Sequence, residues 1–180
     1  MPVIAQWTYR SRQLVAALLG RVSNSDMEEA CSLLEPSPYA LFGALPRQYR
    51  RHGLAVYRRV RENGCTDRIV WQAALLHDCG KYDPDSGRYV TVVHRVLVVI
   101  LESVPGGNRI ARALASQGRH HPGGWVFYPF YLSRNHARLG AELAARRGTQ
   151  DEVVRLIAAH HGRKNGDSRL LALQAADDES

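Results

Sequence analysis

The sequence predicts an all-α fold, and three observations support this class. Apolar residues recur at intervals of three and four positions through most of the chain, whereas strand-like alternation is scarce. Breaks rich in proline and glycine separate these periodic segments. The chain has 180 residues, the length of one ordinary domain with a full hydrophobic core. We therefore expect a single helical bundle, without internal repeats or interdomain linkers.

Capping signals and breaks set the bounds of the expected helices. Ser25 and Glu28 predict a capping box at the start of one helix, and Thr149 and Glu152 predict another. A turn at 39–44, a polar turn at 82–88 and a loop rich in glycine and aromatics at 118–129 connect helices. We expect residues 1–44 to pack as N-terminal helices on a core domain formed by residues 45–180. The expected helices span about 11–22, 25–34, 46–62, 67–78, 90–102, 108–117, 129–147, 149–161 and 167–177.

Charge and cysteine content restrict the function classes. The formal net charge is +7, so an anionic partner is expected. Nearly all of this charge is arginine, because the only lysines are Lys81 and Lys164. The odd number of cysteines, none in a CxxC pair, disfavours a disulfide framework or a zinc finger. The N-terminus does not have the pattern of a signal peptide, and the longest apolar run, 96–101, is too short to span a bilayer. We expect a cytoplasmic protein that does not interact with membranes.

An adjacent imidazole and carboxylate, His77 and Asp78, lie near the middle of the chain, at the end of an apolar helical segment. Gly80 follows, and we expect it to release the backbone from the helix. Lys81 comes next, and a lysine is rare in this chain. This combination marks 77–81 as the centre of a candidate site.

Further polar residues fall on the apolar stripes of their predicted helices. A side chain on such a stripe points toward the core, where a polar group needs a partner and a charge needs a counter-charge or a metal. Facing helices of a bundle can bring such side chains to one point, as in metal sites built in bundle cores. The residues concerned are His52, His77, His136, His160 and Asp177.

Imidazole and carboxylate ligands suit Mn, Fe, Co, Ni or Zn and do not suit Ca. Asp78 is a natural bridging ligand because a carboxylate has two oxygens. One ion could be held by His52, His77, Asp78 and Asp177. A second could be held by His136, His160, His161 and Asp78. Two such ions would activate a hydroxide and clamp a phosphoryl oxygen. We therefore predict a site for one or two divalent transition-metal ions.

Each of these residues also has a simpler interpretation. A single histidine on an apolar stripe is usually a hydrogen-bonded core residue, and Asp177 can be an ordinary C-terminal charge. We interpret His94 as structural, and His120 and His121 as residues of a loop or pocket rim. The arginine pairs 50–51, 58–59 and 146–147 are most often a solvated face. The metal hypothesis depends on the joint pattern.

The ordered set His52, His77-Asp78, His136, His160-His161 and Asp177 resembles the HD superfamily of metal-dependent phosphohydrolases over about residues 45–178. The stretch 73–81 resembles the central motif of that family, 135–140 and 157–162 resemble its later histidine motifs, and 173–177 is similar to the helix with its last aspartate. The resemblance implies an HD fold with a divalent metal on His52, His77, Asp78 and Asp177. His136, His160 and His161 match the subset with a two-metal site, in which cyclic-dinucleotide phosphodiesterases use a similar His-His-Gly motif. The Gly-Tyr-Pro signature of one cyclic-di-GMP branch is not present.

The expected function is hydrolysis of a phosphomonoester or phosphodiester, with a nucleotide or cyclic dinucleotide as substrate. We expect Asp78 and Lys81 to be catalytic, and the resemblance implies that Lys81 contacts the substrate phosphate. Arg119, Arg134 and Arg163 are further candidates for substrate binding. One alternative is an HD-fold di-iron oxygenase with a similar ligand series. Another is a non-catalytic binding domain stabilised by metal; nucleic acid is not a favoured partner, because the sequence has no RNA-binding signature and no continuous basic stripe.

Overall fold

The computed structural model describes residues 22–103, 106–120, 127–163 and 166–180. In these ranges helices dominate, and the strands form one small hairpin, which confirms the predicted all-α class. None of the described helices is both long and apolar enough to cross a lipid bilayer. The helices are α2 (Asn24–Leu33), α3 (Pro36–Ala44), α4 (Arg47–Glu62), α5 (Arg68–Leu76), the short 3-10 helix η1 (Cys79–Lys81), α6 (Val92–Ser103), α7 (Gly107–His120), α8 (Tyr128–Arg146), α9 (Asp151–Ala159) and α10 (Ser168–Asp178).

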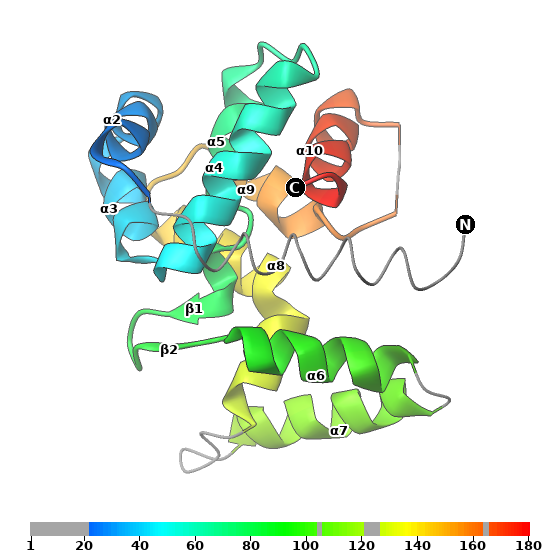
Figure 1. Ribbon diagram of the computed structural model, residues 1–180. Coiled ribbons are helices and arrows are strands. Elements are labelled where there is room, and N and C mark those ends of the chain that lie inside the picture. Colours follow the sequence, from blue (N-terminus) through cyan, green and yellow to red (C-terminus); the bar gives the residue numbers. More distant parts are fainter. Residues whose placement is uncertain (1–21, 104–105, 121–126, 164–165) are drawn as a thin grey trace.

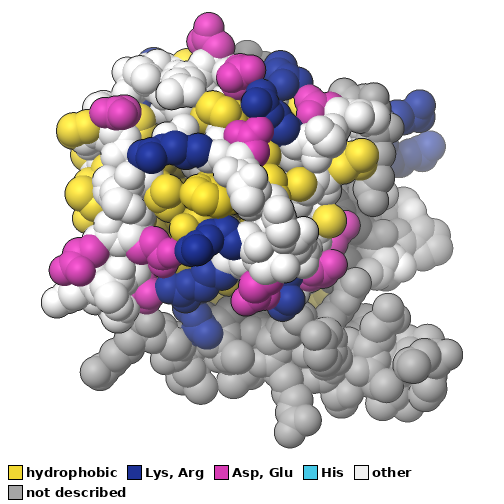
Figure 2. Space-filling view, turned by 90° about the horizontal axis from the view of Figure 1, so that it is seen from above, with side chains coloured by type: hydrophobic (Ala, Val, Ile, Leu, Met, Phe, Trp, Pro, Cys, Tyr) yellow, Lys and Arg dark blue, Asp and Glu magenta, His cyan; other side chains and the backbone are white. Residues whose placement is uncertain are grey.

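The described helices form two groups joined by α8. Figure 1 shows α4, α5, α9 and α10 gathered in one part of the molecule, with α6 and α7 side by side at the other end. Helix α8 contacts α7 near one end of its length and η1 and α9 elsewhere. On the face seen in Figure 2, basic and acidic side chains lie interspersed, as on an ordinary solvated surface. The apolar core lies between α4, α5, α9 and α10 and includes Tyr49, Leu54, Leu75, Leu156 and Leu173.

Two predicted capping boxes are wrong. The box of α2 is formed by Ser23 and Asp26 rather than by Ser25 and Glu28: Asp26 N donates to Ser23 Oγ, and Ser23 N donates to Asp26 Oδ2. Before α9, Gln150 occupies the N-cap position without a side-chain hydrogen bond. Thr149 Oγ1 is buried and has no hydrogen-bond partner among the described residues. In each case a residue of the right type lies close to the true cap, and sequence spacing does not distinguish the two positions.

The expected connections also differ from the structure. Residues 39–44 are not a turn but part of α3, because Pro36 occupies the first helical position, where its missing N–H costs nothing. The polar turn at 82–88 is the turn of an antiparallel hairpin, in which β1 (Tyr82–Asp83) pairs with β2 (Arg88–Tyr89). Of the expected loop at 118–129, α7 takes the first part and α8 the last, while 121–126 lie outside the described residues. Most of the helix expected at 11–22 also lies outside them.

Helices α4 and α5 approach each other closely at Gly53. A Cβ at this position would lie 2.7 Å from the carbonyl oxygen of Leu75, closer than a real Cβ comes to backbone. The absence of a side chain therefore permits the close crossing of the two helices. His52 precedes Gly53 on α4, and His77 caps the C-terminus of α5, so this crossing sets the separation of the two imidazoles.

Asp67 is expected to stabilise the fold at the start of α5. Its Oδ1 accepts from Ile69 N at 2.9 Å as the N-cap, and its Oδ2 accepts from Arg169 Nε of α10 at 2.6 Å. Replacement by alanine removes this cap, and we expect the free energy of unfolding to fall by about 1 kcal/mol. Urea denaturation measures the change. Ser23→Ala, which removes the cap of α2, is the matched control; a loss for Asp67→Ala no larger than that for an exposed surface substitution would contradict the assignment.

Candidate metal centre

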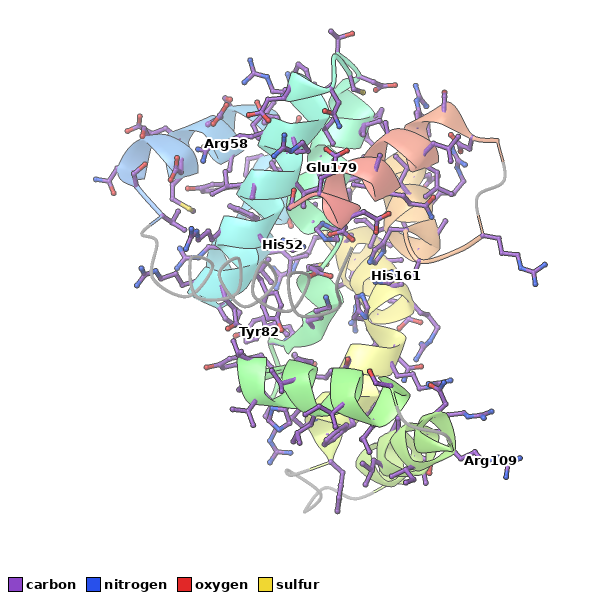
Figure 3. The ribbon with its side chains drawn as sticks, turned by 45° about the vertical axis from the view of Figure 1, so that its right-hand side comes forward. His52, Arg58, Tyr82, Arg109, His161 and Glu179 are labelled. Carbon is purple, nitrogen blue, oxygen red and sulfur yellow. The ribbon has the colours of Figure 1, made fainter. Side chains whose placement is uncertain are left out.

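Histidine and aspartate side chains from separate helices meet beside η1. Figure 3 shows His52, on α4, and His161, just beyond α9, on two sides of this place. His77 caps α5, Asp78 precedes η1, and most of the side chains concerned are buried. We call this set the His/Asp cluster, and it consists of His52, His77, Asp78, His136, His160, His161 and Asp177.

One half of the His/Asp cluster, the first group, contains His52, His77, Asp78 and Asp177. Asp177 Oδ1 lies 3.0 Å from His52 Nε2 and 3.4 Å from His77 Nε2. Asp78 lies 3.8 Å from His52 Nε2 through Oδ2 and 3.7 Å from His77 Nε2 through Oδ1. Two ligands of one transition-metal ion, each at about 2.1 Å, lie at most about 4.2 Å apart. These separations are therefore compatible with a single shared ion.

The other half, the second group, contains His136, His160 and His161. One ligand atom from each lies within 4.8 Å of those of the other two. His136 Nε2 and His161 Nε2 are 2.9 Å apart. His136 and His160 lie on two different helices, α8 and the end of α9, so the packing of these helices creates the group. It consists of imidazoles alone, unlike the first group with its two carboxylates.

Asp78 lies between the two groups. Its Oδ1 is 3.7 Å from His77 Nε2 in the first group, and 3.5 Å and 4.0 Å from the Nε2 atoms of His136 and His160 in the second. Its Oδ2 is 3.8 Å from His52 Nε2 and accepts a hydrogen bond from Lys81 Nζ at 2.8 Å. One carboxylate thus faces both groups, which is the geometry of a bridging ligand.

Three buried histidines are oriented in the same way. The Nδ1 of His77, His136 and His160 donates to the carbonyl oxygen three residues earlier, at 2.9, 2.6 and 2.7 Å. Because a carbonyl can only accept, Nδ1 carries the hydrogen and Nε2 of the neutral ring keeps its lone pair. Such bonds fix the ring and tautomer of metal-binding histidines. Each Nε2 is therefore held toward Asp78 as a potential ligand.

Several atoms at the centre of the cluster are buried without a hydrogen-bond partner. Among the described residues, His77 Nε2, His160 Nε2 and Asp78 Oδ1 have no hydrogen-bond partner. Leaving such a group unpaired costs about 1–3 kcal/mol, and more for a charged one. All three point into one small region, and a cation there would satisfy them together. The donor set thus fits a divalent metal ion.

Burial and neighbouring charges set the protonation of the cluster. Burial, reinforced by Lys81, lowers the pKa of His136 to about 3, and burial together with His77 lowers the pKa of His160 to about 4. Burial would raise the pKa of Asp78, but Lys81 and His77 outweigh it and hold that pKa well below its usual range. Burial would also raise the pKa of Asp177, but the hydrogen bond with His52 and the nearby His77 imidazole outweigh it and lower that pKa. At neutral pH the carboxylates of Asp78 and Asp177 are ionised and the imidazoles of His136 and His160 are neutral, which is the state in which these groups bind metal.

Gly80 has a role that differs from the predicted one. Its φ is not positive, so it is not needed to release the backbone from the helix. Instead, a Cβ at Gly80 would lie 2.1 Å from the carbonyl oxygen of His136 and 2.4 Å from the amide nitrogen of Gly140. A glycine is required because η1 lies directly against the backbone of α8. This contact, which the sequence does not reveal, brings Asp78 within reach of His136.

The other predicted site residues have different positions. Lys81 contacts the cluster through Asp78, whereas the exposed Arg134 and Arg163 make no described contact with it. The side chain of Arg119 lies outside the described residues, as do those of His120 and His121. His94 Nδ1 forms a hydrogen bond with Thr91 Oγ1 at 2.7 Å, and the His94 ring packs edge-on against Phe130. Gly53 and Gly140 were not identified from the sequence, because their importance comes from close tertiary contacts.

Metal binding is expected to stabilise the fold. When the free concentration of the ion is one hundred times its dissociation constant, binding stabilises the native state by about 2.7 kcal/mol. At this chain length, that corresponds to a Tm increase of about 5–10 °C. Differential scanning fluorimetry with Mn²⁺ after chelator treatment measures this shift. Ca²⁺ is the control, because imidazole ligands do not suit it. An equal shift with both ions, or none with Mn²⁺, Fe²⁺, Co²⁺, Ni²⁺ and Zn²⁺, would contradict the assignment.

The comparisons with known proteins do not identify a family for this chain. No protein-family model, no curated protein and no solved structure matches it. The interpretation of the site therefore depends on its own geometry: a buried His/Asp cluster that could hold metal, in an all-α fold.

Proposed function

We propose that this protein is a metal-dependent phosphohydrolase of the HD type, which cleaves a phosphomonoester or phosphodiester of a nucleotide or cyclic dinucleotide. The observation that carries the proposal is the position of Asp78. Its carboxylate faces both histidine groups and is also paired with Lys81 at 2.8 Å. A shared carboxylate, two sets of imidazoles and an adjacent ammonium together form the donor set expected of a site that binds cations and a phosphate.

The residues of the His/Asp cluster would form two ligand sets that share Asp78. His52, His77, Asp78 and Asp177 would hold one divalent ion, and His136, His160, His161 and Asp78 a second. Bound divalent ions polarise a phosphoryl oxygen and make water acidic enough to act as a nucleophile near neutral pH. The buried Nδ1–H bonds to backbone carbonyls keep the imidazoles in the metal-binding tautomer. The net charge of +7 favours an anionic substrate.

Lys81 is proposed to bind the substrate phosphate. Its Nζ lies 2.8 Å from Asp78 Oδ2, and only 12 % of its side chain is exposed. An ammonium in such a place balances the charge that develops on phosphate oxygens, and its low exposure strengthens the interaction.

The three cysteines are free thiols, which supports the proposal that the protein works in the reducing cytoplasm.

Activity with defined metals tests this proposal. Chelator-treated protein reloaded with Mn²⁺ is assayed with an aryl phosphate, a bis-aryl phosphate and a panel of nucleotides and cyclic dinucleotides. We expect metal-dependent release of phosphate or of a nucleotide. No hydrolysis with any of the metals, together with iron-dependent oxygen uptake, would contradict the proposal and indicate the oxygenase alternative.

The variant Lys81→Met is expected to separate substrate binding from metal binding. It removes the ammonium that competes with a cation for Asp78 Oδ2, so metal affinity should be unchanged or higher. The value of kcat/KM should fall about 100-fold or more, as on removal of one group that stabilises a transition-state charge. Isothermal titration with Mn²⁺ and steady-state kinetics measure the two effects. Arg138→Met, an exposed residue of α8 paired with Glu142, is the control; a loss of metal by Lys81→Met would contradict the assigned role.

A further inference from the structure

Gln174 connects α10 to the second group. It lies three residues before Asp177, so both side chains are on one face of α10. The residue is only 8 % exposed. Its Nε2 donates to the carbonyl oxygens of His160 and Gly162, each at 3.0 Å. The two accepting residues are those on either side of His161.

These carbonyls lie where α9 has ended. The last carbonyls of a helix have no intrahelical partner and need donors from elsewhere. Gln174 supplies both of its amide hydrogens, one to each carbonyl. The backbone on the two sides of His161 is thereby fixed relative to α10, and the backbone of His160 is fixed with it.

The side chain amide has one possible orientation. If it were turned over, Oε1 would face two carbonyl oxygens, and no hydrogen bond could form. In the observed orientation Oε1 is buried and has no partner among the described residues. The unpaired buried acceptor costs free energy, but an apolar residue at this position would leave the carbonyls of His160 and Gly162 without this donor. The glutamine is therefore better explained by the two carbonyls that it holds.

We propose that Gln174 is a positioning residue for the second metal ion, an inference that depends on the two-metal site of the proposed function. It holds the end of α9 so that the Nε2 atoms of His160 and His161 remain near that of His136, which lies 2.9 Å from His161 Nε2. Helix α10 then serves both groups. Asp177 takes part directly in the first, and Gln174 acts on the second through the backbone.

The composition of the two groups makes the second ion the sensitive one. The first group contains two carboxylates, Asp78 and Asp177, beside its two imidazoles. The second consists of imidazoles and shares only Asp78 with the first. A cation gains more from the anionic group, so the first ion binds more tightly. Weaker binding at the second group depends more on exact ring positions, and Gln174 should influence that ion alone.

Titration of Mn²⁺ into chelator-treated full-length protein tests the proposal. Gln174→Met keeps the length of the side chain and removes both donors. Removing a residue that orients metal ligands typically costs 10–100-fold in affinity, and we expect about a tenfold loss for the second ion and no change for the first. Isothermal calorimetry resolves the two binding steps. A second ion bound as tightly as in the wild type would overturn the proposal.

Gln72→Met is the matched control. Gln72 is 7 % exposed, and its Nε2 donates to the carbonyl oxygen of Leu33 at 2.7 Å, away from the cluster. The Gln72→Met variant should bind both ions as the wild type does. A loss of affinity for the second ion equal to that of Gln174→Met would show a general effect of destabilisation and overturn the proposal. If Gln174→Met does not fold, Gln174→Glu, which also removes the donors, takes its place with the same expectation. A wild-type protein that binds no ion would overturn the proposed function together with this inference, whereas two ions bound equally by the wild type and the variant would overturn this inference alone.

Discussion

Replacement of Asp78 by asparagine is expected to abolish metal binding and hydrolysis together. The carboxylate is 3 % exposed and faces His77, His136 and His160 through one oxygen and His52 through the other. An amide keeps the shape of the side chain but has one oxygen instead of two and no negative charge. Both proposed ions lose a ligand at once, so kcat should fall about a thousandfold or more.

Metal content after gel filtration and steady-state hydrolysis measure the effect of Asp78→Asn. The fold should survive without metal, since the substitution preserves the volume of the side chain, and circular dichroism checks this. Asp83→Asn is the control: Asp83 lies two residues beyond Lys81, and its Oδ2 accepts from Tyr128 and Ser86 rather than facing the cluster. The control should retain metal and activity. Full hydrolysis by Asp78→Asn protein free of metal would refute the proposed mechanism.

The sequence contained enough information to select His77, His136 and His160, because helical periodicity shows which polar side chains point inward; it also selected Arg134 and Arg163, which are exposed and make no described contact with the cluster. His136 and His160 lie on different helices, yet each occupies an apolar stripe, and both are buried. What periodicity cannot give is the distance between helices. The separation of 3.5 Å between His136 Nε2 and Asp78 Oδ1 results from the contact of η1 with α8, and that contact depends on Gly80.

Errors in the local predictions have related causes. Ser23 and Ser25 both suit an N-cap, and only the path of the chain selects Ser23. Residues 39–44 were expected to form a turn, but proline suits the first position of a helix, and Pro36 begins α3, which includes them. Gln174 carries no motif at all. Its position three residues before Asp177 was a usable signal, since it places a polar amide on the buried face of α10.

The substitution Gly80→Ala is expected to be the most damaging single methyl addition at the site. The new Cβ would lie 2.1 Å from His136 O and 2.4 Å from Gly140 N, and both neighbours are backbone atoms that cannot rotate away. The two segments must separate, which we expect to cost about 3 kcal/mol or more, the upper end for overpacking. At this chain length the loss corresponds to a Tm decrease of about 6–12 °C. Because Asp78 and His136 move apart with the two segments, metal affinity should fall as well.

Alanine substitutions at two further glycines provide comparisons for the effect of Gly80→Ala. At Gly43 in α3 no atom lies within 4 Å of the added Cβ, so Gly43→Ala should raise stability by about 0.5–1 kcal/mol through helix propensity. At Gly140 the nearest atoms are Gly80 N at 3.0 Å and Cys79 Sγ at 3.2 Å, which predicts an intermediate loss. Thermal unfolding and Mn²⁺ titration of the three variants should therefore rank them in the order Gly43, Gly140, Gly80. If Gly80→Ala bound metal and unfolded like Gly43→Ala, the close contact of η1 with α8 could not be what places Asp78 beside the histidines of the second group.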